Sequence, residues 1–133
     1  FMVAFASASQ AARFALAAQE ALSREKWPAD VGEVRVRIGI HLGEPLVVEE
    51  ASGRIDYLGP VVNRAARIAQ AAHGGQVLVS EALLRAAGEA LSGAVLADIG
   101  DHRLRGIERP ERLGFAHLAK GSSGLPAPAE LGV

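Results

Sequence analysis

One stretch of the chain decides its fold: Arg54-Ile55-Asp56-Tyr57-Leu58-Gly59-Pro60-Val61-Val62-Asn63-Arg64-Ala65-Ala66-Arg67. Its first residues pair with 46–50 across a turn at 51–53, which predicts a hairpin. Pro60 stands where prolines open helices, and the sequence predicts a helix over 61–72 that the residues His73-Gly74-Gly75 stop. The stretch therefore encodes a hairpin strand that leads directly into a helix.

The chain before this stretch predicts a strand, a helix and a second strand. Residues 1–5 are apolar and are consistent with a strand. Ser7 or Ser9 can cap a helix that ends before Pro28, with apolar positions at three- and four-residue steps: Ala11, Phe14, Ala15, Ala18 and Leu22. Residues 34–41 alternate as in a half-buried strand, with one face formed by Val34, Val36, Ile38 and Ile40 and the other by Arg35, Arg37, Gly39 and His41.

The chain after this stretch continues the alternation of strands and helices. Strands are predicted at 76–79, 95–99 and 112–118, and Ser80 is predicted to cap a helix through Leu91. Hairpins occur together with crossover helices, which indicates an α+β or α/β fold with a largely antiparallel sheet. We expect one domain over residues 1–118, followed by a linker at 119–133 that is rich in Gly, Ser and Pro.

Composition excludes several classes of function. The chain has 133 residues and a net charge of −1, so no bulk field favours nucleic acid or an anionic membrane. It contains no Cys, which rules out thiolate catalysis and disulfides within this sequence. No apolar run approaches the roughly 20 residues of a membrane helix. We expect a cytoplasmic domain.

Three polar residues of the opening stretch suit a nucleotide site. Asn63 and Arg67 are four residues apart on the helix and share a face, and Asp56 lies just before the turn that feeds it. A carboxylate can accept from the exocyclic amine of a base, an amide can position a ribose, and a guanidinium can meet phosphate charge. Each residue alone reads equally well as a turn carboxylate or a solvated helix side chain, so only the set is suggestive.

The same stretch resembles the signature of the class III adenylyl and guanylyl cyclase catalytic domains, over residues 56–67. Residues 36–44 (Val-Arg-Ile-Gly-Ile-His-Leu-Gly-Glu) are similar to the strand and turn that precede it in that family. Residues 73–80 match the strand that follows, and residues 100–110 match the closing segment. Order and spacing agree over about residues 1–118. The resemblance implies a ferredoxin-like βαββαβ-type sheet with helices packed on it, without its first strands and helix.

The resemblance also implies a role for five residues. Asp56 falls on the position that reads the purine, where Asp goes with adenine, and Asn63 on the position that orients the ribose. Arg67 falls on the position that stabilises the pentavalent transition state. Arg37 and Arg105 fall on positions that contact the triphosphate. Read without the family, Arg37 is a charge on the sheet surface and Arg105 a charge in a loop.

Family members also hold two divalent cations, Mg²⁺ or Mn²⁺, with two Asp residues on adjacent strands. The motifs that carry these two residues do not occur here, so we predict no metal ligand in this chain. Residues 1–5 would be the strand that returns just after the second of them. None of the other carboxylates considered replaces them: Glu49, Glu50, Asp98 and Asp101. We therefore expect the chain as given to be an N-terminally truncated, inactive piece of its domain.

Two classes of function remain open. The first is part of a nucleotidyl cyclase that converts ATP to 3′,5′-cyclic AMP and pyrophosphate, working as a head-to-tail homodimer with further domains in the parent protein and without nucleic acid. The second is a non-catalytic cyclase-homology module for dimerisation or nucleotide sensing. An unrelated ferredoxin-like domain is the weakest alternative, because similar sheets support many activities.

Overall fold

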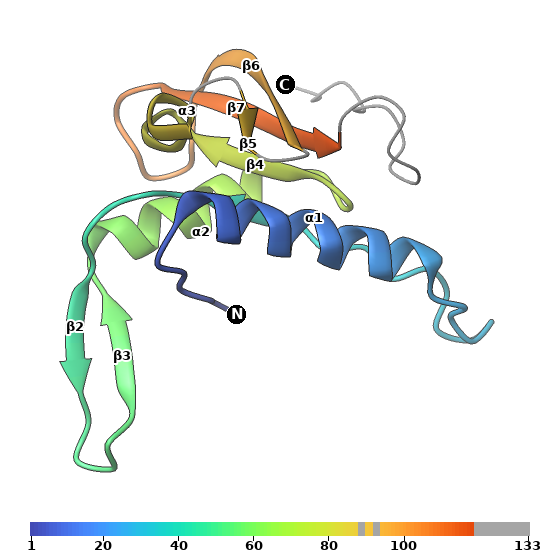
Figure 1. Ribbon diagram of the computed structural model, residues 1–133, viewed down its shortest axis with the longest axis horizontal. Coiled ribbons are helices and arrows are strands. Elements are labelled where there is room, and N and C mark those ends of the chain that lie inside the picture. The colour runs from blue at the N-terminus through green and yellow to red at the C-terminus, as the bar shows by residue number, and fades with distance from the viewer. Residues whose placement is uncertain (88–89, 92–93, 119–133) are drawn as a thin grey trace.

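A mixed sheet with helices on both faces forms the body of the molecule (Figure 1). The structure is a computed structural model that describes residues 1–87, 90–91 and 94–118. Its elements in chain order are α1 (Ala8–Arg24), β1 (Ile38–Ile40), β2 (Leu46–Glu49), β3 (Ile55–Leu58), α2 (Pro60–Ala71), β4 (Val77–Ser80), α3 (Glu81–Ala87), β5 (Ala90–Leu91), β6 (Ala94–His102) and β7 (Glu111–Leu118). The predicted α+β class is confirmed. The expected linker at 119–133 lies outside the described residues.

The sheet is largely antiparallel, as the sequence predicts. Its five strands have the order β1-β4-β7-β6-β5, and the β1–β4 pair is parallel while the pairs β4–β7, β7–β6 and β6–β5 are antiparallel. Strands β2 and β3 form a separate antiparallel hairpin, which confirms that prediction too. This hairpin projects away from the sheet (Figure 1).

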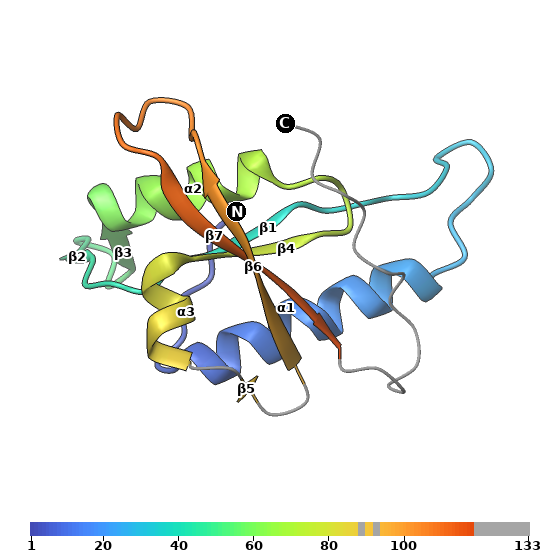
Figure 2. The same cartoon turned by 90° about the horizontal axis from the view of Figure 1, so that it is seen from above.

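The core has two layers, one on each side of β4. All four residues of β4 are buried. Val77 and Val79 belong to the cluster that α1 covers, and Leu78 belongs to the cluster that contains Ile68 of α2. Successive side chains of a strand point to opposite faces, so β4 is enclosed by apolar side chains from both sides. Figure 2 shows α1 and α2 on opposite sides of the strands.

The predicted helix starts are confirmed. Ser7 caps α1, where its Oγ accepts from the backbone N–H of Gln10 at 3.1 Å. Pro60 is the first residue of α2, and Gly59 before it has a φ of 110°. This φ lies in the region that favours glycine, so the Gly-Pro pair sets the direction in which the chain leaves β3.

The buried face of α1 differs from the predicted one by about one residue. Phe14 was expected to face the core, but it is 50% exposed, and its ring lies 5.2 Å from that of Phe5. The buried residues of α1 are Ala12, Ala15, Leu16 and Gln19. The reason is polar as well as apolar, because Gln19 donates its side-chain amide to the backbone carbonyls of Val36 and Gln76. A buried glutamine is not visible in an apolar periodicity.

Two strand predictions were wrong or too long. Residues 1–5 form no strand, since they pair with none of the described strands, and Phe1, Met2, Val3 and Phe5 are exposed. The strand predicted at 34–41 is confined to Ile38–Ile40, where it pairs with β4. Before Ile38 the carbonyl of Val36 accepts from Gly75 and Gln19 rather than from a regular ladder. Alternation alone does not show where a neighbouring strand begins.

The helix predicted from Ser80 to Leu91 is also shorter than expected. Its cap is confirmed, because Ser80 Oγ accepts from the N–H of Leu83 at 3.2 Å. The helix ends at Ala87, and Ala90–Leu91 form β5 and pair with β6 instead. Residues 88–89 lie outside the described part of the chain.

Helix α2 approaches β1 at Gly39 so closely that no side chain fits between them. A methyl group at Gly39 would lie 2.3 Å from the backbone nitrogen of Ala69 and 2.8 Å from the carbonyl oxygen of Ala65. The face that the sequence assigned to Arg35, Arg37, Gly39 and His41 is therefore covered by a helix at Gly39 rather than by solvent.

We predict that Gly39→Ala destabilises the fold by about 3 kcal/mol, the upper end of the usual cost of overpacking, because the atoms that the methyl group would meet belong to backbone. Urea unfolding measures this. The control is Gly53→Ala: nothing lies within 4 Å of that position, whose φ is 82°, so only backbone strain of about 1 kcal/mol is expected. Equal losses in the two variants would contradict the close approach.

Candidate functional site

The three residues that the sequence singled out lie on β3 and α2. Asp56 is half-buried on β3, and its Oδ1 accepts from the backbone N–H of Tyr57 at 2.9 Å. Asn63 lies in the first turn of α2 and is exposed. Arg67 follows one turn later and is half-buried. The shared face of Asn63 and Arg67 follows from the helix, as predicted.

Arg67 is held against a turn that is distant in sequence. Its Nη1 donates to Oε1 of Gln70 at 3.1 Å. A methyl group at Gly106 would lie 3.7 Å from both Nε and Nη2 of Arg67. The guanidinium therefore lies over Gly106. This glycine has a φ of 78° and belongs to the loop between β6 and β7. The neighbouring residue in this turn is Arg105, which is exposed.

Arg37 reaches the same end of α2. Its Nη1 donates to the backbone carbonyl of Gln70 at 3.5 Å. This carbonyl belongs to the last turn of α2, whose free carbonyl groups carry a partial negative charge that favours cations. Arg37 and Arg67 therefore converge on one residue, Gln70, and Arg105 directly precedes the glycine over which Arg67 lies.

The structure does not bring Asp56 into this group. Asp56 belongs to the β2–β3 hairpin, which projects from the body (Figure 1). No hydrogen bond or ion pair within the described residues joins Asp56 to the arginines. Within one chain, the candidate base-reading residue and the arginine group are thus separate features.

A second polar cluster was not found from the sequence. Arg64 of α2 and Glu111 of β7 form an ion pair with a 2.6 Å Nη1–Oε2 distance. A cavity of about 230 Å³ lies beside this pair, lined by His41, Arg64, Glu81, Ala82, Arg85 and Glu111. The residues of the pair are 47 positions apart, so no local spacing could have linked them.

His41 lies in this cluster with a buried ring nitrogen. Its Nδ1 has no hydrogen-bond partner among the described residues. Burial lowers the pKa of His41 below 6.5, and the nearby Arg64 lowers this pKa further, whereas Glu111 acts in the opposite direction. The imidazole is consequently neutral at pH 7. The sequence pattern placed His41 only on one face of a predicted strand.

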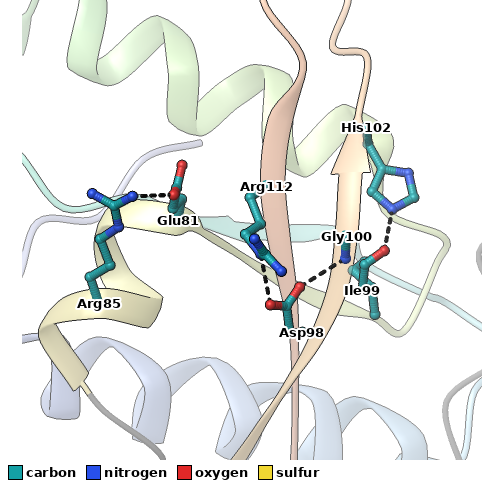
Figure 3. A network of polar contacts seen from close by, with 7 residues as sticks. All are labelled: Glu81, Arg85, Asp98, Ile99, Gly100, His102 and Arg112. Carbon is teal, nitrogen blue, oxygen red and sulfur yellow. Dashed lines mark hydrogen bonds and ion pairs between the residues drawn. The ribbon is translucent and has the colours of Figure 1, made fainter.

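Asp98 supports a bulge in the sheet. The register of β6 and β7 shifts between Asp98 and Gly100. Oδ1 of Asp98 accepts from the N–H of Gly100 at 2.9 Å, and Oδ2 accepts from Nε of Arg112 at 2.7 Å (Figure 3). The Gly100 amide, and after it Arg112, lower the pKa of the Asp98 carboxyl. Both oxygens are engaged by this chain's own donors, which is a structural role.

The chain belongs to the adenylate and guanylate cyclase catalytic domain family, whose model matches residues 2–113. It is 40% identical over 116 residues to an uncharacterized protein of Mycobacterium tuberculosis, covering 84% of this chain and 35% of that protein. It is 38% identical over 104 residues to an adenylate cyclase of Mycosarcoma maydis, covering 64% of this chain and 4% of that protein. The chain thus spans about a third or less of these relatives.

The fold is that of solved cyclases. An adenylate cyclase of Trypanosoma brucei in its monomeric state superposes with a TM-score of 0.73 at 24% identity, covering 83% of this chain and 64% of that one. The expected cyclase-type sheet is confirmed by this likeness. No helix within residues 1–87, 90–91 and 94–118 is both long and apolar enough to cross a membrane.

The two divalent cations that the family resemblance implies do not fit the described residues. Across residues 1–87, 90–91 and 94–118, no group of three or more His, Cys, Asp or Glu side chains could hold a metal ion. Asp98, a carboxylate on β6, is already engaged by Gly100 and Arg112. No chemical step is therefore assigned to these ions.

We predict that His41 makes the stability of the chain depend on pH. Its pKa is lower in the folded chain than the ordinary 6.5, so the unfolded chain binds more protons once the pH falls below 6.5. The free energy of unfolding should therefore fall as the pH drops from about 6.5 towards the lower folded pKa, and this contribution is complete above about pH 7.5. Urea unfolding at pH 7.5 and 5.5 measures the change.

The control variants separate His41 from the rest of the chain. In His41→Gln the part of the acid-induced loss that is due to this ring should disappear. In His102→Gln, a histidine whose Nε2 lies 3.0 Å from the carbonyl oxygen of Ile99, the loss should persist. An identical loss in wild type and His41→Gln would contradict the assignment.

Proposed function

We propose that this chain is part of a nucleotidyl cyclase that converts ATP to 3′,5′-cyclic AMP and pyrophosphate. The observation that carries the proposal is the convergence of Arg37 and Arg67 on Gln70 beside the turn of Arg105. These are three of the residues to which the resemblance gives phosphate and transition-state roles. They come from three separate parts of the sequence, and the fold gathers them at one end of α2.

For this cyclisation reaction a protein mainly has to supply positive charges at fixed positions. The 3′-oxygen of the ribose bonds to the α-phosphorus, the bond from this phosphorus to its bridging oxygen breaks, pyrophosphate leaves and the hydroxyl proton is lost. Phosphoryl transfer is accelerated mainly by positioning and by stabilisation of charge on the phosphoryl oxygens. We assign Arg67 to the pentavalent transition state, Arg37 and Arg105 to the triphosphate, and Asn63 to the ribose.

Asp56 is proposed to select the base. Its Oδ1 accepts from the backbone of Tyr57, and a carboxylate has acceptor sites to spare for a second donor. The exocyclic amine of adenine can donate to it, whereas guanine presents a carbonyl oxygen at the corresponding position, which a carboxylate repels. This chemistry supports ATP over GTP.

A second copy of the chain is the proposed partner in a head-to-tail homodimer. The β2–β3 hairpin supports this, because its apolar side chains are exposed although they suit burial: Leu46 (66%), Val47 (61%), Val48 (42%), Ile55 (55%) and Leu58 (46%). An apolar surface of this kind marks an interaction site. A dimer would also bring Asp56, which lies on the hairpin, to a surface of the partner. A cytoplasmic location, where ATP is available, and further domains in the parent protein belong to the same proposal.

The exposed hairpin also favours a second candidate, a non-catalytic cyclase-homology module for dimerisation or nucleotide sensing. The described residues offer no carboxylate set for divalent cations, so we expect the chain as given to bind ATP without turnover. ATP consumption by this chain with Mn²⁺ would contradict that expectation. Turnover or its absence in the full-length protein decides between the cyclase and the module.

We predict that removing an arginine of the group weakens ATP binding. Hydrogen bonds to charged groups contribute about 1.5–3 kcal/mol, so Arg67→Ala and Arg105→Ala should each raise the Kd for ATP by about tenfold to a hundredfold. Isothermal titration calorimetry measures the Kd. The control is Arg13→Ala, an exposed arginine on α1, on the opposite side of the sheet. Binding that is lost equally in the control would mean non-specific attraction.

We predict that Asp56→Ala changes base preference rather than affinity for the triphosphate. The ratio of the GTP and ATP dissociation constants should fall by about tenfold, because one charge-assisted hydrogen bond to the base is lost. Calorimetry with both nucleotides on wild type and variant gives the ratio. An unchanged ratio would remove Asp56 from the base-reading role, whatever the absolute affinities are.

A further inference from the structure

The ion pair between Arg64 and Glu111 differs from the other ion pairs of the described residues. Those pairs are local, either within one helix, as between Glu81 and Arg85 (Figure 3), between nearby loop residues, or across neighbouring strands. Arg64–Glu111 instead joins α2 to β7, which are 47 residues apart at this point. It is also less exposed, since the side chain of Glu111 is 12% exposed and that of Arg64 is 36% exposed.

Arg64 occupies a particular position on α2. It directly follows Asn63 and precedes Arg67 by one turn. At about 100° per residue its direction lies between those of Arg67 and the buried Ile68. A helix is rigid over these five residues, so any rotation of α2 that moves Arg64 also moves Asn63 and Arg67.

The remaining contacts of α2 hold its two halves unequally. The one fully buried residue within the helix is Ile68, in its C-terminal half. In the same half lie Ala69, against Gly39, and Gln70, which accepts from Arg37, while the N-terminal half meets Gly39 through the carbonyl of Ala65 and Gly43 through Val61. The N-terminal half, which carries Asn63, has half-buried or exposed side chains only. Apolar packing has no direction, whereas an ion pair fixes the distance between two atoms on different elements.

The residues around the Arg64–Glu111 ion pair strengthen the restraint that it places on α2. The ring of His41 lines the same cavity as Arg64 and Glu111, and its Nδ1 is shielded from solvent. From α3, Glu81 and Arg85 also face the cavity, but they neutralise each other at 2.6 Å. A charge pair that is partly withdrawn from water interacts more strongly than a surface pair, and the loss of one partner leaves the other unsatisfied.

We propose that Arg64 and Glu111 are positioning residues: their ion pair sets the rotation of α2 about its axis and thereby aims Asn63 and Arg67 at the nucleotide. The role in nucleotide binding rests on the proposed function, whereas the restraint of α2 by the ion pair follows from contacts within this chain alone. Neither residue touches the substrate in this assignment. Both act through the helix.

The first experiment reads the restraint without any nucleotide. Glu111→Gln removes the charge and keeps the size of the side chain. NMR of the full chain should show that the Asn63 side-chain amide and Arg67 Nε–H signals shift. In Arg24→Gln, which breaks the Glu20–Arg24 pair on α1, these signals should stay in place. Unmoved signals in Glu111→Gln would overturn the proposal irrespective of what the chain binds.

The second experiment tests that the effect passes through Arg67. We expect Glu111→Gln to raise the Kd for ATP about tenfold in the wild-type background and less than twofold in the Arg67→Ala background. Additive losses would indicate general destabilisation and would overturn the proposal. Thermal unfolding of each variant verifies that it is folded. If wild type binds no ATP while the NMR signals shift, the proposed function fails and the positioning role stands.

A reversed pair provides the rescue. In Arg64→Glu combined with Glu111→Arg, the two charges exchange places and can still meet between α2 and β7. The NMR signals and the ATP affinity should return to within about threefold of wild type, while Arg64→Glu alone should lose more than Glu111→Gln because two carboxylates then face each other. A double variant no better than Arg64→Glu would overturn the proposal.

Discussion

The burial of β4 is the constraint on which the rest of the structure depends. All four residues of this strand are buried. In a sheet with one face open to solvent, only alternate residues of a strand are buried. Burial of both faces requires a helix on each side, which α1 and α2 provide. Burial of both edges requires two neighbours, β1 and β7. The elements that enclose the faces and edges of β4 are therefore α1, α2, β1 and β7.

The position of α2 then decides which arginines come together. Because Gly39 has no side chain, the backbone of α2 rests directly on β1. This contact brings the last turn of the helix within reach of Arg37, and the loop between β6 and β7 places Gly106 under the guanidinium of Arg67. The proposed function relies on a few placed charges and not on a bulk field, since the net charge of the whole chain is −1.

Two kinds of interaction hold α2 in place, and they have different effects. Apolar burial around Ile68 attaches the helix to the sheet but specifies its direction poorly. The polar contacts at Arg64, Gln70 and Arg37 add direction at both ends of the helix. The hairpin of β2 and β3 is the opposite case. Within the described residues its two strands pair only with each other, and their apolar side chains are exposed.

The sequence by itself determined those elements that a few neighbouring residues specify. The Ser7 cap, the Gly59-Pro60 entry to α2 and the hairpin could be predicted because a few neighbouring residues specify each of them. The shared face of Asn63 and Arg67 follows from helix geometry alone. The family resemblance implied roles for these two residues, which periodicity cannot supply.

Tertiary structure decided everything that depends on residues distant in sequence. It left residues 1–5 outside the sheet, ended the helix after Ser80 at Ala87, and buried Gln19 rather than Phe14. It alone paired Arg64 with Glu111 and placed Arg67 over Gly106. The physical reason is that strand pairing, burial and ion pairs are properties of two partners in space, whereas propensity and periodicity describe one segment at a time.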